Sequence, residues 1–171
     1  MRWYRSEYAI VGCILGVRLL AALWFASQTP LWEQIDEINH YQYARFLAFE
    51  RRLPTNADRP PIPQGLEIFL QFNQPPLYHA LLSPAILAFD EDEPMRVFAN
   101  PPPSCNVPFR QRYIHGANEQ FPFEGIARAA WGARLITILM GILATFFIWL
   151  TGRILWPDKR RVGLFAAGLF A

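Results

Sequence analysis

The chain has 171 residues, of which 53% are hydrophobic and only 18% are charged. Soluble domains typically carry about 25% charged residues, so this composition favours a membrane protein. The formal net charge of +2 indicates no nucleic-acid partner. The sequence contains no phosphate-binding loop, dinucleotide fingerprint or zinc-ligand spacing. Its two cysteines, Cys13 and Cys105, give no disulfide framework.

The first apolar block predicts a transmembrane helix. It runs from Tyr8 to about Ala26 and follows two arginines near the N-terminus. About 20 apolar residues cross a bilayer, so we expect residues 1–26 to form the first span, with a cytoplasmic N-terminus. A cleaved signal peptide is the alternative, which the length of the run and the charge of Arg18 disfavour. For Arg18 itself, structural pairing and anion binding remain equally open.

The second apolar block is the strongest transmembrane signal in the chain. Residues 135–152 carry no charge, and we expect the second transmembrane helix at 129–155. A basic cytoplasmic loop at 156–161 follows. The apolar run at 162–171 is too short to cross a membrane. We therefore expect it to be the start of a truncated third transmembrane helix, and the chain to be the N-terminal piece of a longer protein.

Basic residues predict the orientation of these spans. They cluster before the first span and between the second and third, and the positive-inside rule places both clusters in the cytoplasm. Residues 27–128 then lie outside, and they hold 12 of the chain's 14 acidic residues. The predicted fold is all-α: an integral membrane protein with interfacial helices in a large first outer loop. The expected location is the cell membrane, multi-pass, in a bacterial inner membrane.

The outer loop contains two predicted interfacial helices. The first covers about 30–52, because Thr29 can cap a helix and Pro30 suits its first position. The second covers 76–89, a segment too apolar for water and too short to span. Prolines, glycine and charges predict an irregular loop at 90–127, and we expect the acidic run at 90–93 to be solvated.

The first outer helix carries the candidate chemistry. Its residues Glu33, Asp36, Glu37 and His40 are three and four apart, so we expect them to share one helical face. Carboxylates crowded in this way repel one another unless a cation, a proton or a substrate lies among them. The alternative is a helix start whose acids complement the helix dipole. For His40 alone, a structural histidine is the competing interpretation.

Three stretches resemble a known family in their order and placement. They are DEINHYQYARFLAFERRLP, QPPLYHALLSPA and GARLITILMGILATFFIWLTGRIL. Together with the first span, this arrangement resembles the N-terminal region of polyprenyl-phosphate-dependent membrane glycosyltransferases of the GT-C superfamily. The most similar group includes protein O-mannosyltransferases and aminoarabinose transferases. The resemblance covers most of the chain outside residues 90–124.

The resemblance implies transfer of a sugar from a polyprenyl-phosphate donor to an acceptor hydroxyl at the outer membrane face. Asp36 matches the general base, with Glu37 as the second catalytic residue. Crowding by neighbouring carboxylates is expected to raise the pKa of Asp36. The departing phosphate needs cations. The implied substrate-binding residues are His40, Tyr41, Arg45, Gln74, Tyr78, Arg128 and Arg134.

Gln74 departs from the family pattern. Some relatives carry Lys or His before the Pro-Pro pair, whereas Gln74 brings no charge to a phosphate. Arg128 and Arg134 have an alternative role as anchors at lipid headgroups. The implied partners are the lipid-linked sugar donor and the bilayer. No cofactor is assigned, no metal ligand is named, and a divalent metal stays open.

The competing function is that of a non-catalytic or transport-type polytopic membrane protein. The acidic outer helix would then be structural or ion-binding. A transporter is expected to place ionisable residues midway along several spans, and only Arg18 is placed in this way.

Overall fold

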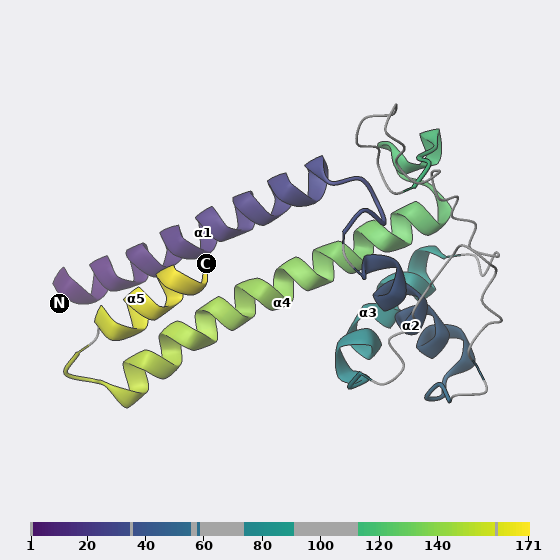
Figure 1. Cartoon of the computed structure of the whole chain (residues 1–171). Helices are drawn as coiled ribbons and strands as arrows, with labels where there is room; N and C mark the ends of the chain where they lie inside the picture. The colour runs from purple at the N-terminus through teal and green to yellow at the C-terminus, as the bar shows by residue number, and fades with distance from the viewer. Residues whose placement is uncertain (1, 35, 56–57, 59–73, 91–112, 160) are drawn as a thin grey trace, which may run out of the picture. The chain divides into compact units, whose positions relative to one another are not determined.

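The computed structural model describes residues 2–34, 36–55, 58, 74–90, 113–159 and 161–171. This described part is all-α (Figure 1). Its helices are α1 (Arg2–Gln28), α2 (Glu37–Glu50), α3 (Leu77–Phe89), α4 (Gly125–Leu155) and α5 (Arg161–Phe170), with a 3₁₀ turn η2 at Ala117–Glu119. The chain forms two compact units, residues 1–28 with 137–171 and residues 29–136.

The first unit contains the two long apolar helices. Both α1, from Glu7 onwards, and α4 are long and apolar enough to cross a membrane. Their apolar blocks were the predicted spans. Each helix extends beyond its prediction: α1 continues to Gln28, past the expected end at 26, and α4 begins at Gly125, before the expected start at 129. The reason is that polar residues flanking an apolar block continue the helix without changing its backbone hydrogen bonding.

Short side chains let α4 and α5 approach closely within the first unit. A Cβ atom added to Gly152 would lie 2.5 Å from the Cα atom of Gly163, so the two backbones touch. Trp149 is buried beside Val11 and Ala167. Its indole N–H donates to Glu7 Oε1 at 3.2 Å. The segment at 162–171, predicted as the start of a helix, is α5.

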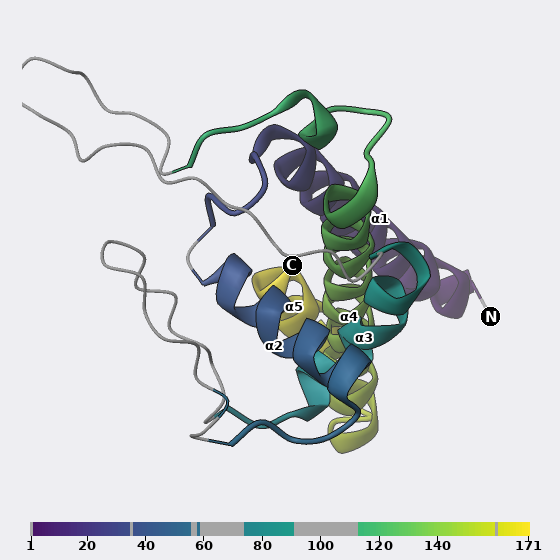
Figure 2. The same cartoon turned by 90° about the vertical axis from the view of Figure 1, so that its right-hand side faces the viewer.

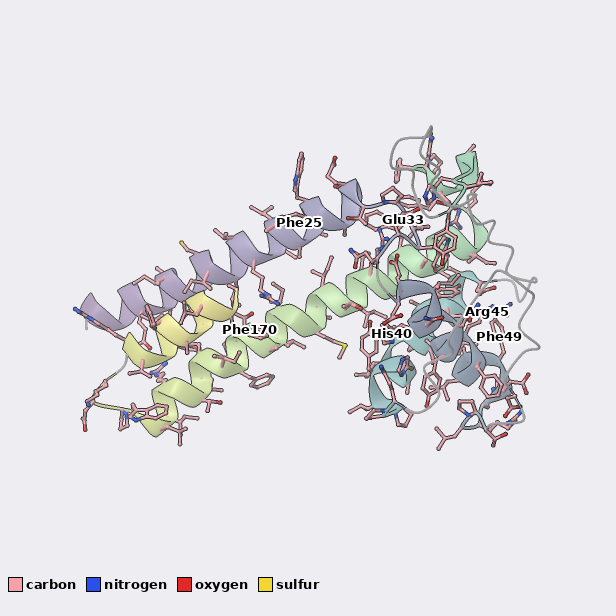
Figure 3. All side chains as sticks on the ribbon, viewed as in Figure 1. Phe25, Glu33, His40, Arg45, Phe49 and Phe170 are labelled. Atoms are coloured by element: carbon pink, nitrogen blue, oxygen red, sulfur yellow. The ribbon has the colours of Figure 1, made fainter. Side chains whose placement is uncertain are left out.

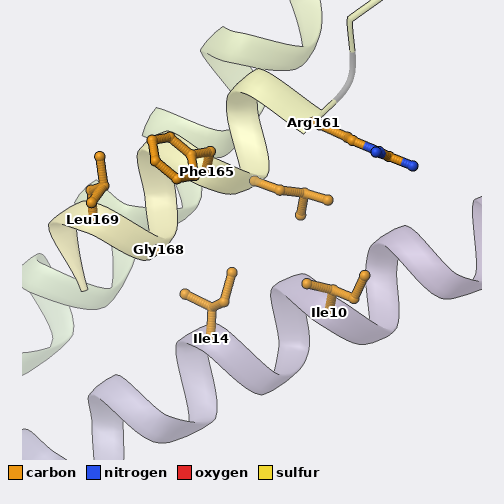
Figure 4. A pocket seen from close by; sticks show the side chains of 7 residues that line it. Ile10, Ile14, Arg161, Phe165, Gly168 and Leu169 are labelled. Atoms are coloured by element: carbon orange, nitrogen blue, oxygen red, sulfur yellow. The ribbon is translucent and has the colours of Figure 1, made fainter.

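An apolar groove lies between α1 and α5, with a volume of about 560 Å³. Figure 4 shows Ile10 and Ile14 of α1 pointing toward α5, which contributes Phe165, Gly168 and Leu169 to the lining. At the C-terminal end of α5, Arg18 Nη1 donates to the carbonyl oxygens of Phe170 and Ala171 at 2.6 and 3.0 Å. This contact is of the structural kind, and anion binding by Arg18 stays a prediction.

The second unit is built on the packing of α2 against α3 (Figure 2). The first turns of α4 contribute small residues to the same core, with Ala129 and Ala130 at most 3% exposed. A Cβ atom on Gly132 would lie 3.0 Å from the Cβ atom of Ala85. Alanine and glycine on this part of α4 therefore allow α3 to pack closely against it.

The predicted start of the first outer helix is wrong. The helix α2 begins at Glu37, not near Pro30, because Asp36 adopts a left-handed conformation with φ 63° and ψ 2°. Aspartate is one of the few residues that tolerate this conformation, and it interrupts a right-handed helix. Glu33 and Asp36 therefore precede the helix and do not share a helical face with Glu37 and His40.

The remaining outer-loop predictions have mixed outcomes. The helix predicted at 76–89 is confirmed as α3, Leu77–Phe89. Of the loop predicted at 90–127, residues 91–112 lie outside the described part of the chain. The solvated position predicted for Asp90 is wrong, because this residue is only 7% exposed. Its carboxylate is buried by two partners on α2, Tyr41 and Arg45.

Candidate functional site

Asp36 lies at the junction between an irregular segment and α2, and it is half-buried. Its main-chain carbonyl accepts the first helical hydrogen bond, from the N–H of His40 at 2.9 Å. Its carboxylate does not cap the helix. Oδ1 accepts a hydrogen bond from Asn39 Nδ2 at 3.2 Å. Within the described residues, Oδ2 has no hydrogen-bond donor, so this carboxylate keeps capacity to accept a proton or a hydrogen bond.

Glu37 and Arg134 form a bidentate ion pair, which we call the Arg134 clamp. Arg134 Nε and Nη2 donate to the two carboxylate oxygens of Glu37 at 2.5 and 2.8 Å. Arg134 also donates to the carbonyl oxygens of Thr29 and Pro30. Its side chain is 9% exposed. At least four of its five N–H donors are thus occupied by protein, and the clamp joins α4 to the segment before α2.

The Arg134 clamp also holds a strained residue. Trp32 has φ 70°, a conformation that is rare for a bulky side chain. Its backbone N–H donates to Glu37 Oε2 at 2.8 Å, and its ring is buried against Tyr41. Glu37 therefore anchors the backbone between α1 and α2. This is a structural role for the residue predicted as the second catalytic carboxylate.

Glu33 is engaged by a different partner, His115. The imidazole of His115 bonds Glu33 Oε1 at 3.0 Å and Glu119 Oε2 at 2.6 Å through its two nitrogens. Burial lowers the pKa of His115, but the hydrogen bonds and charges of the two glutamates raise it more, so the net shift is upward. The backbone N–H of Tyr113 also donates to Glu33 Oε1, at 2.9 Å, so these contacts fasten residues 113–119 to the segment before α2.

Asp36 is therefore the carboxylate of this group that remains available. Glu33 and Glu37 each pair with a basic side chain, whereas Asp36 has the single amide partner Asn39 among the described residues. The predicted crowding of three carboxylates is thus resolved by pairing. The cations that pair with Glu33 and Glu37 come from residues more than 80 positions further along the chain.

The residues His40 and His79 form a second feature, which we call the histidine pair. Nδ1 of His40 lies 3.0 Å from Nε2 of His79, a hydrogen bond that joins α2 to α3. His79 is 1% exposed and stacks on Tyr43, with ring centroids 4.0 Å apart. Burial, and next the charge of His40, lower the pKa of His79 to about 4 although the Pro75 carbonyl raises it.

His40 is half-buried, whereas its partner His79 is fully buried. Burial lowers the pKa of His40, and the negative charge of Asp36 partly offsets this shift. Tyr78 contacts both histidine rings edge-on. The structure thus places Tyr78 against His40, and it places Asp36 near enough to His40 for its charge to act on the ring.

Tyr41 and Arg45 turn away from this group. Both donate to Oδ2 of the buried Asp90 at 2.8 Å. Burial, and next the hydrogen bond to Asp90, raise the pKa of Tyr41. The guanidinium of Arg45 also lies over the ring of Phe49 (Figure 3). These contacts fasten the C-terminal end of α3 to α2, so the structure gives both predicted substrate-binding residues a packing role.

Two predicted residues remain at the surface. Gln74 is exposed just before α3, and its carbonyl accepts a long hydrogen bond from Tyr43 at 3.5 Å. Arg128 is exposed on the first turn of α4, where its Nε donates to the carbonyl of Phe123 at 2.9 Å. Arg128 therefore still has Nη1 and Nη2 directed to no acceptor within the described residues. In this it differs from Arg134.

Sequence reasoning missed His79, His115 and Asp90. His79 lies on an apolar helix and His115 in a segment expected to be irregular, so no local pattern singles out either residue. Both are recognised only through partners that are distant in sequence. Among the residues described, no group of three or more His, Cys, Asp or Glu side chains is arranged to hold a metal ion.

No protein-family model, curated protein or solved structure matches this chain.

Proposed function

We propose that this chain belongs to a membrane enzyme that transfers a sugar from a polyprenyl-phosphate donor to an acceptor hydroxyl. The observation that carries the proposal is the conformation and hydrogen bonding of Asp36. It is half-buried, held at positive φ at a helix start, and keeps an unoccupied carboxylate oxygen within the described part of the chain. Unusual backbone conformations of this kind concentrate at functional sites.

A membrane location is supported by the exposure of the apolar helices. Within the most apolar windows of α1 and α4, only 11% and 17% of the residues are buried. A core helix of a soluble protein would be mostly buried. The face of α3 that is turned away from α2 is apolar as well, with Leu77 70% exposed and Leu87 53% exposed. Such a helix is suited to lie in the interface between lipid and water.

In the proposed reaction, Asp36 removes the proton from the acceptor hydroxyl. The hydroxyl oxygen forms a bond to the anomeric carbon of the sugar, and the bond from that carbon to the phosphate oxygen breaks. The polyprenyl phosphate leaves with an added negative charge, which calls for cationic stabilisation. Arg128 is the candidate cation, because Arg134 is already paired with Glu37.

The substitution Asp36→Asn tests this proposal. Asparagine adopts the left-handed conformation readily and keeps the size of the side chain, so the variant is expected to fold normally. Loss of general-base help should lower the rate of transfer by about 100- to 10,000-fold. The measurement is sugar transfer by the full-length protein with a panel of polyprenyl-phosphate sugars.

The exposed carboxylate of Asp158, between α4 and α5, offers a matched control. Asp158→Asn should transfer sugar at the normal rate. Near-normal transfer by Asp36→Asn would remove Asp36 as the base. Absence of transfer by the unsubstituted protein with every donor would favour the non-catalytic alternative.

A further inference from the structure

The apolar groove between α1 and α5 follows one face of each helix. Its lining on α5 comes from positions 161, 164, 165, 168 and 169, which have the three- and four-residue spacing of a single helical face. On α1 it comes from Ile10 and Ile14, one turn apart. Apart from Arg161, the lining residues are isoleucine, leucine, phenylalanine and glycine. The groove is therefore apolar along both helices, with one charged side chain among the described residues that line it.

Glycine keeps the groove open at the end away from Arg161. A Cβ atom added to Gly168 would meet only the Cδ1 atom of Ile14, at 4.0 Å. The side chains beside it do not close the space, because Phe165 is 70% exposed and Leu169 is 75% exposed. Apolar side chains around an unfilled groove of about 560 Å³ are unfavourable in water. In a protein whose long helices can cross a membrane, the same groove is suited to a hydrocarbon chain.

Arg161 lies at the other end of the groove, where α5 begins (Figure 4). It is exposed and makes no hydrogen bond or ion pair within the described residues. By contrast, Arg153 donates to the hydroxyl of Tyr8. The loop at 156–161 carries three basic residues and one acidic residue. Because a guanidinium presents N–H donors that match the oxygens of a phosphate, this end of the groove favours a phosphate.

The length of the groove corresponds to one leaflet of a bilayer. Leu169 follows Arg161 by eight positions, which is about 12 Å along a helix. Half of the hydrocarbon core of a bilayer is about 15 Å thick. The predicted topology places residues 156–161 at the cytoplasmic surface. Arg161 would then lie among the headgroups and Gly168 within the cytoplasmic leaflet.

We propose that this groove binds an anionic phospholipid of the cytoplasmic leaflet, with the lipid phosphate on Arg161 and one acyl chain along the groove. A phospholipid supplies both complements in one molecule, an anion at one end and an apolar chain beyond it. Basic pockets between transmembrane helices on the cytoplasmic side bind anionic headgroups in this way. The proposal needs the membrane location of α1 and α4 but does not need the proposed sugar transfer.

Binding of phosphatidylglycerol to the full-length protein tests the proposal. The protein is titrated with this lipid in a neutral detergent, and the bound lipid is counted by native mass spectrometry. A salt concentration of about 0.5 M screens the attraction between exposed charges that are not in contact. Phosphatidylcholine with the same acyl chains is the matched lipid without net charge. Glycerol phosphate tests the anion without a chain.

Phosphatidylglycerol should saturate a site that binds phosphatidylcholine about 5-fold more weakly, and glycerol phosphate should not bind. Equal binding of the two phospholipids would overturn the proposal, because only lipid that surrounds the helices without selectivity would remain. Glycerol phosphate that binds as tightly as phosphatidylglycerol would also overturn it, since the groove would then contribute nothing.

Two variants separate the charge from the groove. Arg161→Gln should weaken binding of phosphatidylglycerol about 5-fold and abolish the preference over phosphatidylcholine. Gly168→Leu places a side chain in the open end of the groove and should weaken binding of both phospholipids. Unfolding temperatures without added lipid verify that each variant is folded.

Each variant has a matched control. Lys159→Gln removes a charge from the same loop at an exposed position that does not line the groove. Gly12→Leu adds the same side chain to α1, where nothing lies within 4 Å of the Cβ position. Both controls should bind phosphatidylglycerol like the unsubstituted protein. Equal losses in Arg161→Gln and Lys159→Gln would show only a general attraction to the loop and would contradict the site.

A photoreactive phosphatidylglycerol locates the bound lipid without any substitution. With a diazirine midway along one acyl chain, and as a minor component of phosphatidylcholine nanodiscs, it should crosslink to the groove-lining residues of α1 and α5. Crosslinks spread evenly over the exposed faces of α1 and α4 would refute the site. Absence of crosslinks in the groove, because a second copy or another segment of the full-length chain fills it, would refute it as well. Neither measurement depends on sugar transfer, so this proposal and the proposed function fail separately.

Discussion

Neighbouring acidic residues have different roles in this chain because their partners differ. Glu37 is held by the Arg134 clamp and Glu33 by His115. Asp36, between them in sequence, has only Asn39 as a partner among the described residues. A paired carboxylate is a poor base because its lone pairs are already used. Availability of the carboxylate, and not acidity of the segment, therefore distinguishes Asp36.

The Arg134 clamp predicts unequal effects for two arginines of α4. Arg134→Gln leaves Glu37 without its cation, and breaking a buried pair typically costs about 3–5 kcal/mol. Because the two side chains are 9% and 16% exposed, we expect the lower end of this range. Thermal unfolding in detergent measures the loss.

The matched control is Arg128→Gln, since Arg128 is exposed on the same helix. It should change the free energy of unfolding by no more than about 0.5 kcal/mol. The double variant Glu37→Gln with Arg134→Gln should recover part of the loss because no charge stays buried. Equal unfolding temperatures for the two single variants would refute the structural role of the clamp.

Two kinds of contact join the elements of this chain. One is the close packing of small residues between helices, and the other is the hydrogen bonding of a titratable side chain, His115, in a loop. The backbones of α4 and α5 meet at Gly152 and Gly163. Close helix contacts through small residues are typical of membrane proteins. Residues 113–119 are instead held by hydrogen bonds through His115. The stability that the helix contact provides should depend on side-chain volume and not on pH. The stability that the His115 contact provides should depend on pH and much less on side-chain volume.

Gly163→Ala tests the contact between α4 and α5. The added Cβ atom would lie 2.6 Å from the carbonyl oxygen of Trp149 and 3.1 Å from the backbone nitrogen of Arg153. Backbone atoms cannot move aside, so the helices must separate, at a cost of about 1–3 kcal/mol. Gly16→Ala on α1 is the control, since nothing lies within 4 Å of its Cβ position. Both are compared by thermal unfolding, and equal loss in the two variants would speak against the contact.

The loop contact predicts a pH dependence that His115 controls. The pKa of His115 is raised in the folded state, so the folded protein binds the proton more tightly than the unfolded chain. The resulting stabilisation is complete below the ordinary histidine pKa of about 6.5 and is lost as the pH rises through the folded pKa.

The difference in unfolding temperature between the unsubstituted protein and His115→Gln should therefore be largest near pH 6 and shrink towards about pH 9. A His40→Gln variant serves as the comparison, because the pKa of His40 is lowered and not raised. A gap that stays constant over this range would show that the glutamates do not hold a proton on His115.

On the scale of the whole molecule, charge predicts which parts face which side of a membrane. The two apolar helices α1 and α4 are long enough to cross, and basic residues flank their predicted cytoplasmic ends. The acidic segment that contains Asp36 would then lie on the outer side. The proposed reaction requires this side, because that is where the resemblance places the lipid-linked donor.

Cysteine labelling tests the orientation. In a background with Cys13→Ser and Cys105→Ser, single cysteines replace Asn100 and Asp158. A membrane-impermeant maleimide applied to intact cells should label Asn100→Cys, because residues 27–128 are predicted to lie outside. Asp158→Cys should be labelled only after permeabilisation. Labelling of Asp158→Cys in intact cells would refute the topology.

Sequence alone determined where most helices of the described residues lie, but not where α2 begins. The two long apolar helices and α3 follow from apolar length. The all-α class was predicted on the expectation that backbone groups in lipid are satisfied within the chain, and the described residues are all-α. The length of an apolar run is read from one segment of the sequence, so predicting such a helix requires no knowledge of distant contacts. The helix predicted at 76–89 therefore agrees with α3, Leu77–Phe89, to within one residue.

Only the tertiary structure decided the state of each side chain in the candidate site. The start of α2 at Glu37, the burial of Asp90 and the pairing of His40 with His79 all depend on partners that are distant in sequence. Arg134 lies 97 residues after Glu37, and no local pattern connects them. A carboxylate's charge is evident from its residue type, whereas its availability depends on which cation the fold brings to it.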